Sequence, residues 1–174
     1  TVPQDVYVNR PSGPIKNVDK RLTNVTRDDK WFKAPHAKIL VVDDVAMNRK
    51  VITKLMSPSN MKIDSAEDGI RALEMIKSNT YDLIFLDHMM PEMDGIETLQ
   101  HIKEMGITEV PVIMLTANAV PGIKEMYLES GFNDYLAKPV TEDALIQCCL
   151  KHIKPVLIEK WPDVSSMITN TNIS

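Results

Sequence analysis

The sequence has no segment suited to a membrane span or to secretion. It contains no run of about 18 apolar residues, which excludes a helix that crosses a bilayer. The chain opens with TVPQDVYV, which lacks the basic start and apolar stretch of a secretory signal peptide. We therefore expect no membrane contact by this chain and a cytoplasmic setting.

Residues that bind soft metals are scarce. Cys148 and Cys149 are the only cysteines, and we find no further Cys or His at a spacing suited to zinc. Neighbours on a helix point in different directions, so both are interpreted as packing residues in a reducing compartment. His36, His101 and His152 are interpreted as surface or boundary residues, and no Ca²⁺-binding EF-hand loop occurs.

Positive charge is not in excess, because the formal net charge is −4. This balance argues against nucleic-acid binding by this chain alone. The first 36 residues carry seven Lys and Arg against four Asp, a balance of +3 that leaves −7 for the remainder. They also hold four prolines and no sustained periodicity, so 1–36 is predicted to be a linker or the remnant of a preceding domain. We place the folded domain at 37–153 and a C-terminal tail at 154–174.

From residue 37 onward, short apolar runs alternate with amphipathic segments. The runs have the length of buried parallel strands, and the segments have apolar residues at helical spacing. Asp94 and Thr141 are predicted helix caps. Five strands alternating with five flanking helices predict an α/β fold with a doubly wound parallel sheet. Strands are expected at 37–42, 61–66, 81–86, 111–115 and 133–137. Helices are expected at 47–56, 67–78, 95–104, 120–130 and 141–153. Helix residues expected to face inward include Met47, Val51, Ile52, Met56 and Ile70.

Polar residues come directly after four of the apolar runs. They are Asp43 and Asp44, Asp87, Thr116 and Lys138. Because the carboxyl ends of parallel strands meet at one sheet edge, we expect these side chains in one site. Three carboxylates there repel each other and need a cation, and oxygen ligands open to water favour Mg²⁺. The residues therefore predict a phosphoryl-transfer site with Asp43, Asp44 and Asp87 as metal ligands.

Asp87 is the best candidate nucleophile, since it ends the central strand. An ionised carboxylate beside the metal can attack phosphorus and form an aspartyl phosphate. Lys138 would neutralise charge on the transferred oxygens, and Thr116 would hydrogen-bond one of them.

These motifs resemble the receiver domain of two-component response regulators, over roughly residues 37–153. VVDD, LIFLDHMMPEMDG, IMLTANA and DYLAKP occur in family order, with 43 positions from Asp44 to Asp87, 29 more to Thr116 and 22 more to Lys138. The resemblance implies a flavodoxin-like fold and a phosphoprotein switch in signal transduction. Asp87 resembles the phosphoacceptor, Asp44 the direct metal ligand, and Asp43 a ligand acting largely through water.

The resemblance assigns roles to four further positions. The backbone carbonyl of Met89 would bind Mg²⁺, and Pro139 would follow a cis peptide bond. Tyr135 resembles the switch aromatic that turns inward on phosphorylation. Met89 and Asn118 offer no acid to orient an attacking water, which predicts a long phosphoryl lifetime. His88 is expected to point away from the site.

Several segments, among them FKAPHAKILVVDD, are most similar to receivers attached to hybrid sensor histidine kinases. This similarity implies an excised piece of such a kinase, the cytoplasmic part of a membrane-bound protein. The implied partner is a histidine kinase or a histidine phosphotransfer domain in a phosphorelay. The receiver would catalyse its own phosphorylation and slow dephosphorylation. A dimer through the face of the fourth and fifth helices is a further candidate contact.

Three alternatives are weighed against the phosphoacceptor. The main one is a phosphorylation-independent pseudo-receiver, against which the complete set of site residues argues. A haloacid-dehalogenase phosphatase needs an Asp-x-Asp pair, whereas Asp43 and Asp44 are adjacent. A flavodoxin needs a Ser/Thr/Gly-rich phosphate loop, which DDVAMNRK does not provide.

Overall fold

The computed structural model describes residues 26–162, and these fall into two compact units. One unit includes residues 26–31 and 161–162, where Thr26 caps the short helix α3 (Arg27–Lys30). The other unit is Phe32–Lys160. Most of the predicted linker and of the predicted tail lies outside the described residues, so the boundaries at 37 and 153 remain predictions.

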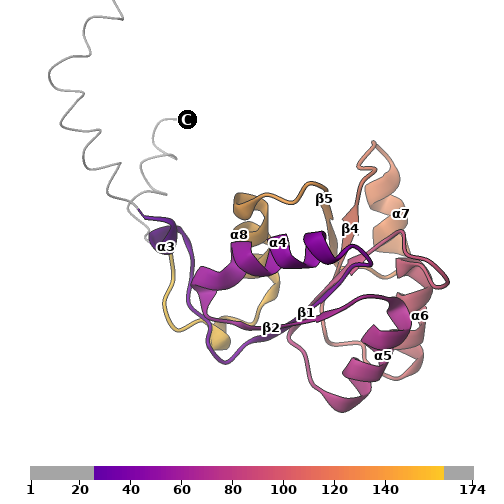
Figure 1. The fold of residues 1–174 in the computed structure, drawn as a ribbon, viewed down its shortest axis with the longest axis horizontal. Coiled ribbons are helices and arrows are strands. Elements are labelled where there is room, and N and C mark those ends of the chain that lie inside the picture. The colour runs from indigo at the N-terminus through magenta and orange to yellow at the C-terminus, as the bar shows by residue number, and fades with distance from the viewer. Residues whose placement is uncertain (1–25, 163–174) are drawn as a thin grey trace, which may run out of the picture. The chain divides into compact units, whose positions relative to one another are not determined.

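Phe32–Lys160 is built on one sheet of five parallel strands in the order β2-β1-β3-β4-β5 (Figure 1). Val42 pairs with Leu86, Asp87 with Leu115, and Thr116 with Ala137, so the strands end together at one edge. The five-stranded parallel sheet expected from the sequence is thus confirmed. The strands are β1 (Lys38–Val42), β2 (Lys62–Ala66), β3 (Leu83–Asp87), β4 (Val112–Thr116) and β5 (Asp134–Ala137).

Helices cover both faces of this sheet (Figure 1). On one face α4 packs against α8, and on the other α5 packs against α6. Asp94 and Thr141 cap α6 and α8 through their side chains, as predicted. None of the described helices is long and apolar enough to span a membrane. The helices are α4 (Ala46–Met56), α5 (Gly69–Ser78), α6 (Gly95–Glu104), α7 (Ile123–Glu129) and α8 (Glu142–His152), with short 3₁₀ turns η1 (Ser57–Ser59) and η2 (Pro155–Leu157).

The core lies between the sheet and its helices, and β1, β3 and β4 are almost wholly buried. Ile52 and Met56 face inward as expected. The prediction was wrong for Met47, Val51 and Ile70, which are 66%, 45% and 49% exposed. Met47 and Ile70 lie in the first turn of their helices, beside the sheet edge, where little apolar surface is available to cover them.

Both cysteines are buried in α8 and neither forms a disulfide. The expectation that no histidine stands at a suitable spacing for a metal was wrong, however. His152 follows Cys148 by one helical turn, and the fold brings Asp134 of β5 beside both. Sequence spacing alone did not reveal this group because one member comes from another element.

Candidate functional site

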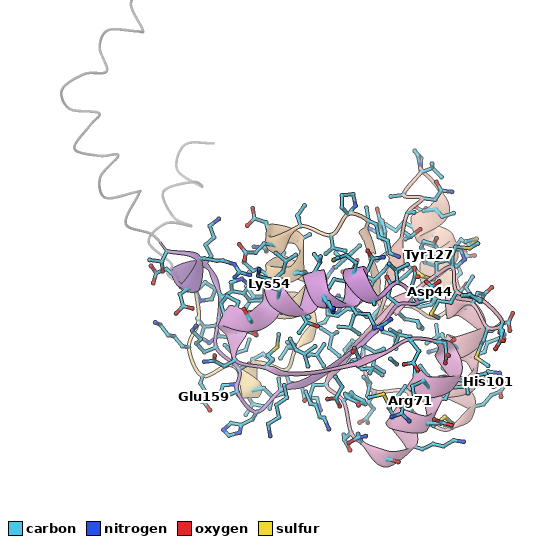
Figure 2. All side chains as sticks on the ribbon, in the orientation of Figure 1. Asp44, Lys54, Arg71, His101, Tyr127 and Glu159 are labelled. Carbon is cyan, nitrogen blue, oxygen red and sulfur yellow. The ribbon has the colours of Figure 1, made fainter. Side chains whose placement is uncertain are left out.

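Three carboxylates meet at the carboxyl edge of the sheet, as the sequence predicted. Asp43 and Asp44 follow β1, and Asp87 is the last residue of β3. One oxygen of each lies within 4.8 Å of the others. Asp43 and Asp87 are buried, whereas Asp44 is exposed where β1 leads into α4 (Figure 2). The group therefore has a solvent-facing side.

Lys138 provides the positive charge inside this group. Its Nζ lies 2.7 Å from Asp87 Oδ1 and 3.0 Å from Asp43 Oδ2. Its backbone N–H donates to the Thr116 carbonyl at 2.8 Å, which joins the ends of β4 and β5. The peptide bond between Lys138 and Pro139 is cis, as the family resemblance implied. Lys138 therefore bridges the two buried carboxylates from the end of β5, which β4 separates from β3 in the sheet.

Asp43 is held by several donors besides Lys138. The Val45 backbone N–H donates to its Oδ1 at 2.9 Å, and Asn48 Nδ2 lies 3.3 and 3.2 Å from its two oxygens. Its position is therefore largely fixed by neighbouring groups, while Asp44 stays free to meet a ligand from solvent. Sequence reasoning did not identify Asn48, although it lies in the first turn of α4, which begins beside the site.

A close backbone approach fixes the segment that follows Asp87. The Gly95 N–H donates to the His88 carbonyl at 2.8 Å. A Cβ at Gly95 would lie 2.4 Å from the Asp87 carbonyl oxygen, a distance that real side chains do not adopt. Only glycine therefore lets α6 begin against the end of β3.

The charges in the site are unbalanced, since three carboxylates face one ammonium. Burial raises the pKa of Asp87, as do the charges of Asp43 and Asp44, against the lowering effect of Lys138. Burial lowers the pKa of Lys138, but its bonds to Asp87 and Asp43 outweigh this effect and leave that pKa raised. A divalent cation coordinated by oxygen would relieve the excess negative charge, so the donor set fits Mg²⁺. The Met89 carbonyl remains a predicted ligand.

Thr116 belongs to a hydrogen-bonded row that sequence reasoning missed. Its Oγ1 accepts from the Asn118 N–H at 3.0 Å and lies 3.0 Å from the hydroxyl of buried Tyr127. That hydroxyl is also 3.1 Å from His88 Nδ1, and the two rings meet edge to face at 5.4 Å. His88, the residue after Asp87, is thus connected through Tyr127 to Thr116, the predicted switch hydroxyl. Nothing in the sequence indicates this link, because it depends on how the fold places Tyr127 of α7 beside Thr116 and His88.

Tyr135, the predicted switch aromatic, is half-buried on β5. It packs against the hydrophobic core, and its ring centroid lies 6.4 Å from that of Tyr127. Tyr127 therefore lies between Thr116, to which it is hydrogen-bonded, and Tyr135, which its ring adjoins.

Comparisons with known proteins agree with this geometry. The family model described as "Response regulator receiver domain" matches residues 39–149. Hybrid signal transduction histidine kinase B of Dictyostelium discoideum is 40% identical over 129 residues, which is 67% of this chain and 7% of that protein. Signal transduction histidine-protein kinase BarA of Escherichia coli is 34% identical over 138 residues, 77% of this chain and 15% of that protein. The chain thus spans only a small part of these relatives.

Solved structures show the same fold. The receiver domain of sensor histidine kinase PA1611 from Pseudomonas aeruginosa has a TM-score of 0.61 and 33% identity, over 67% of this chain and 96% of that one. In that structure a magnesium ion is coordinated in the active site cleft. The receiver domain of the Francisella response regulator 1452 has a TM-score of 0.62 and 36% identity, over 67% of this chain and 95% of that one.

Proposed function

Because the chain belongs to the family of response regulator receiver domains, we propose that it is a signalling switch phosphorylated on Asp87. The donor is the phosphohistidine of a histidine kinase or of a histidine phosphotransfer domain. The observation that supports this proposal best is the bridging of Asp87 and Asp43 by Lys138 at 2.7 and 3.0 Å. A buried carboxylate beside an ammonium and two further carboxylates has the groups that phosphoryl transfer requires.

In the proposed reaction, an Asp87 carboxylate oxygen attacks phosphorus. The new P–O bond forms as the P–N bond to the donor imidazole breaks, and the electron pair of that bond stays on the ring nitrogen. Lys138 stabilises the charge that the transferred oxygens carry. Asp43, Asp44, Asp87 and the Met89 carbonyl would hold Mg²⁺, which neutralises negative charge on the incoming phosphoryl group.

Phosphorylation then changes the partners of Thr116. Its hydroxyl leaves Tyr127 and donates to a phosphoryl oxygen, and Tyr135 follows it inward. The surface around β5, α7 and α8 changes with this movement. Phosphorylation thereby biases an existing equilibrium between the two arrangements of this surface. The same surface is a candidate for a downstream partner or for a second copy of the chain.

The donor domain docks beside the carboxylates. Val45, Met47 and Val51 are 47%, 66% and 45% exposed at the start of α4, and Met89 is 72% exposed after β3. Exposed apolar side chains of this kind mark contact surfaces when they cluster. We infer from the relatives that the donor belongs to the same hybrid kinase or to its relay, and that the chain works in the cytoplasm.

The test is intact-mass spectrometry after incubation with acetyl phosphate. We expect one phosphoryl increment that requires Mg²⁺ and is absent from Asp87→Asn. The exposed Asp143→Asn is the control for removal of a carboxylate and is expected to behave like the wild type. A folded, Mg²⁺-binding wild type that gains no increment, even from a phosphorylated histidine kinase, would identify a phosphorylation-independent module instead.

A further inference from the structure

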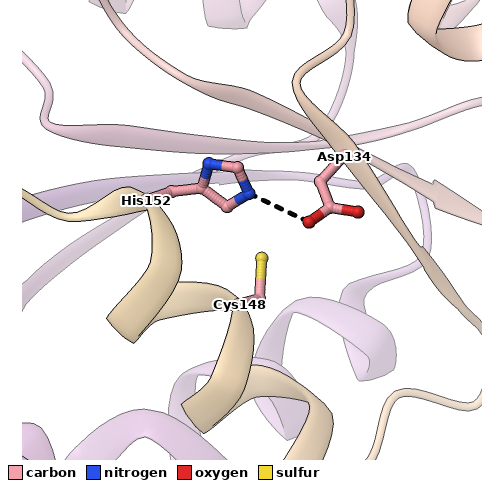
Figure 3. Close-up of side chains that lie close together, drawn as sticks. All are labelled: Asp134, Cys148 and His152. Carbon is pink, nitrogen blue, oxygen red and sulfur yellow. Dashed lines mark hydrogen bonds and ion pairs between the residues drawn. The ribbon is translucent and has the colours of Figure 1, made fainter.

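We propose that Asp134, Cys148 and His152 form a binding site for a zinc-class transition-metal ion, where α8 lies beside the start of β5. Figure 3 shows the sulfur of Cys148 pointing toward the hydrogen-bonded side chains of His152 and Asp134. All three are donors that zinc uses in proteins. This site is separate from the carboxylates at the other end of β5, and it does not depend on phosphorylation of Asp87.

The donor atoms are close to the separations that zinc requires. The ligand atoms of Asp134, Cys148 and His152 lie within 4.8 Å of one another, and His152 Nε2 is 2.9 Å from Asp134 Oδ2. Ligands about 2.0 Å from a tetrahedral ion are about 3.3 Å apart. Small rotations of the side chains bring the atoms to that spacing. Cys148 and His152 lie four residues apart on one helix and therefore project from the same face.

The three donor side chains are mostly shielded from solvent, but a groove gives an ion access to them. Cys148 is 5% exposed, and the side chains of His152 and Asp134 are 12% and 20% exposed. A groove lined by Asp134, Gln147, Cys148 and Lys151 opens beside them. An ion can enter through this groove, and a water molecule from it can complete a four-coordinate shell of three protein ligands and solvent.

The donor chemistry discriminates between this group and the predicted Mg²⁺ site. Thiolate and imidazole favour zinc and its neighbours, whereas three carboxylates favour magnesium. Burial, and then the charge of Asp134, raise the pKa of Cys148 to about 12, so the thiol is protonated without an ion. When the metal–sulfur bond forms, the S–H bond breaks and the proton passes to solvent.

Lys151 competes with the ion for Asp134. Its Nζ lies 3.4 Å from Asp134 Oδ2, but the side chain is 68% exposed and can move into solvent. Lys151→Gln is therefore expected to bind the metal about two- to fivefold more tightly, the fold-change that an exposed ion pair represents. Cys149 is the matched control for Cys148, since it is the adjacent residue, is fully buried, and is not among the three donors.

The experiment is calorimetric titration of the chain with Zn²⁺ in excess Mg²⁺, which keeps the acidic site occupied. We expect one equivalent to bind the wild type and Cys149→Ala alike, and at least about tenfold more weakly to Cys148→Ala and to His152→Ala. Co²⁺ added to the wild type should show a thiolate-to-metal charge-transfer band, a readout that needs no variant. Equal binding by Cys148→Ala and Cys149→Ala, or Co²⁺ bound without that band, would overturn the proposal and indicate adventitious binding only.

Discussion

Replacing Tyr127 by Phe removes the hydroxyl between Thr116 and His88 and leaves the buried ring in place. In the resting structure this hydroxyl lies 3.0 Å from Thr116 Oγ1 and 3.1 Å from His88 Nδ1. The proposed switch requires Thr116 to leave Tyr127 and to donate to the phosphoryl group. The Tyr127–Thr116 bond therefore stabilises the resting arrangement and not the phosphorylated one.

The expected change in the phosphorylation rate follows from loss of the hydrogen bond between Tyr127 and Thr116. An intramolecular hydrogen bond contributes about 0.5–1.5 kcal/mol net. Its loss from the resting arrangement alone shifts the equilibrium between the resting and the reactive arrangement of Thr116 by about 1 kcal/mol. The population of the reactive arrangement then rises about fivefold. If the small resting population of the reactive arrangement limits phosphorylation, Tyr127→Phe should be phosphorylated about fivefold faster. Its free energy of unfolding should fall by about 1–2 kcal/mol, because two hydrogen bonds are lost.

The assay is the initial rate of phosphorylation by acetyl phosphate at saturating Mg²⁺, followed by intact mass, with urea unfolding in parallel. Tyr81→Phe is the matched control. The Tyr81 hydroxyl donates to Asp64 Oδ2 at 2.7 Å. Asp64 lies on β2, at the opposite edge of the sheet from β5, which α7 contacts, so this bond takes no part in the row from His88 to Thr116. Its loss should lower stability without changing the rate. If Tyr127→Phe behaves like Tyr81→Phe, the hydroxyl is only structural, and a slower rate would mean that it supports the reactive arrangement.

Three further outcomes follow from the site. Lys138→Met should be phosphorylated about a hundredfold more slowly, because the ammonium that stabilises the charge on the transferred oxygens is lost, yet it should bind Mg²⁺ no more weakly in calorimetry; a parallel loss of Mg²⁺ affinity would contradict this. Gly95→Ala should lose about 1–3 kcal/mol of unfolding free energy in urea, because the new Cβ meets the Asp87 carbonyl, and a loss below about 0.5 kcal/mol would refute the close approach. The phosphorylated chain should have a half-life well beyond seconds in Mg²⁺ buffer, since Met89 and Asn118 supply no acid to orient water, and decay within seconds would be inconsistent with that.

The sequence predicted the sheet and the cluster of carboxylates with Lys138 because both depend on local patterns. Apolar runs of strand length placed Asp87, Thr116 and Lys138 at strand ends, and parallel pairing brings strand ends together. The structure places Lys138 within bonding distance of Asp87, so spacing and residue type were sufficient for this pair.

What the sequence did not reveal depends on contacts between elements distant along the chain. The link from His88 through Tyr127 to Thr116 requires α7 to pack over two strand ends. The proximity of Asp134 to Cys148 and His152 requires α8 to lie beside β5. In both cases helical periodicity gives the buried face of one element, while the partner of a polar group on that face is set by tertiary packing.

The most direct test of the central claim is transfer from a radiolabelled phosphohistidine kinase to this chain, with and without Mg²⁺. We predict that the wild type acquires label that hydroxylamine removes, as expected of an acyl phosphate, and that Asp87→Asn acquires none. Label that resists hydroxylamine, or equal labelling of Asp87→Asn, would show that Asp87 is not the acceptor.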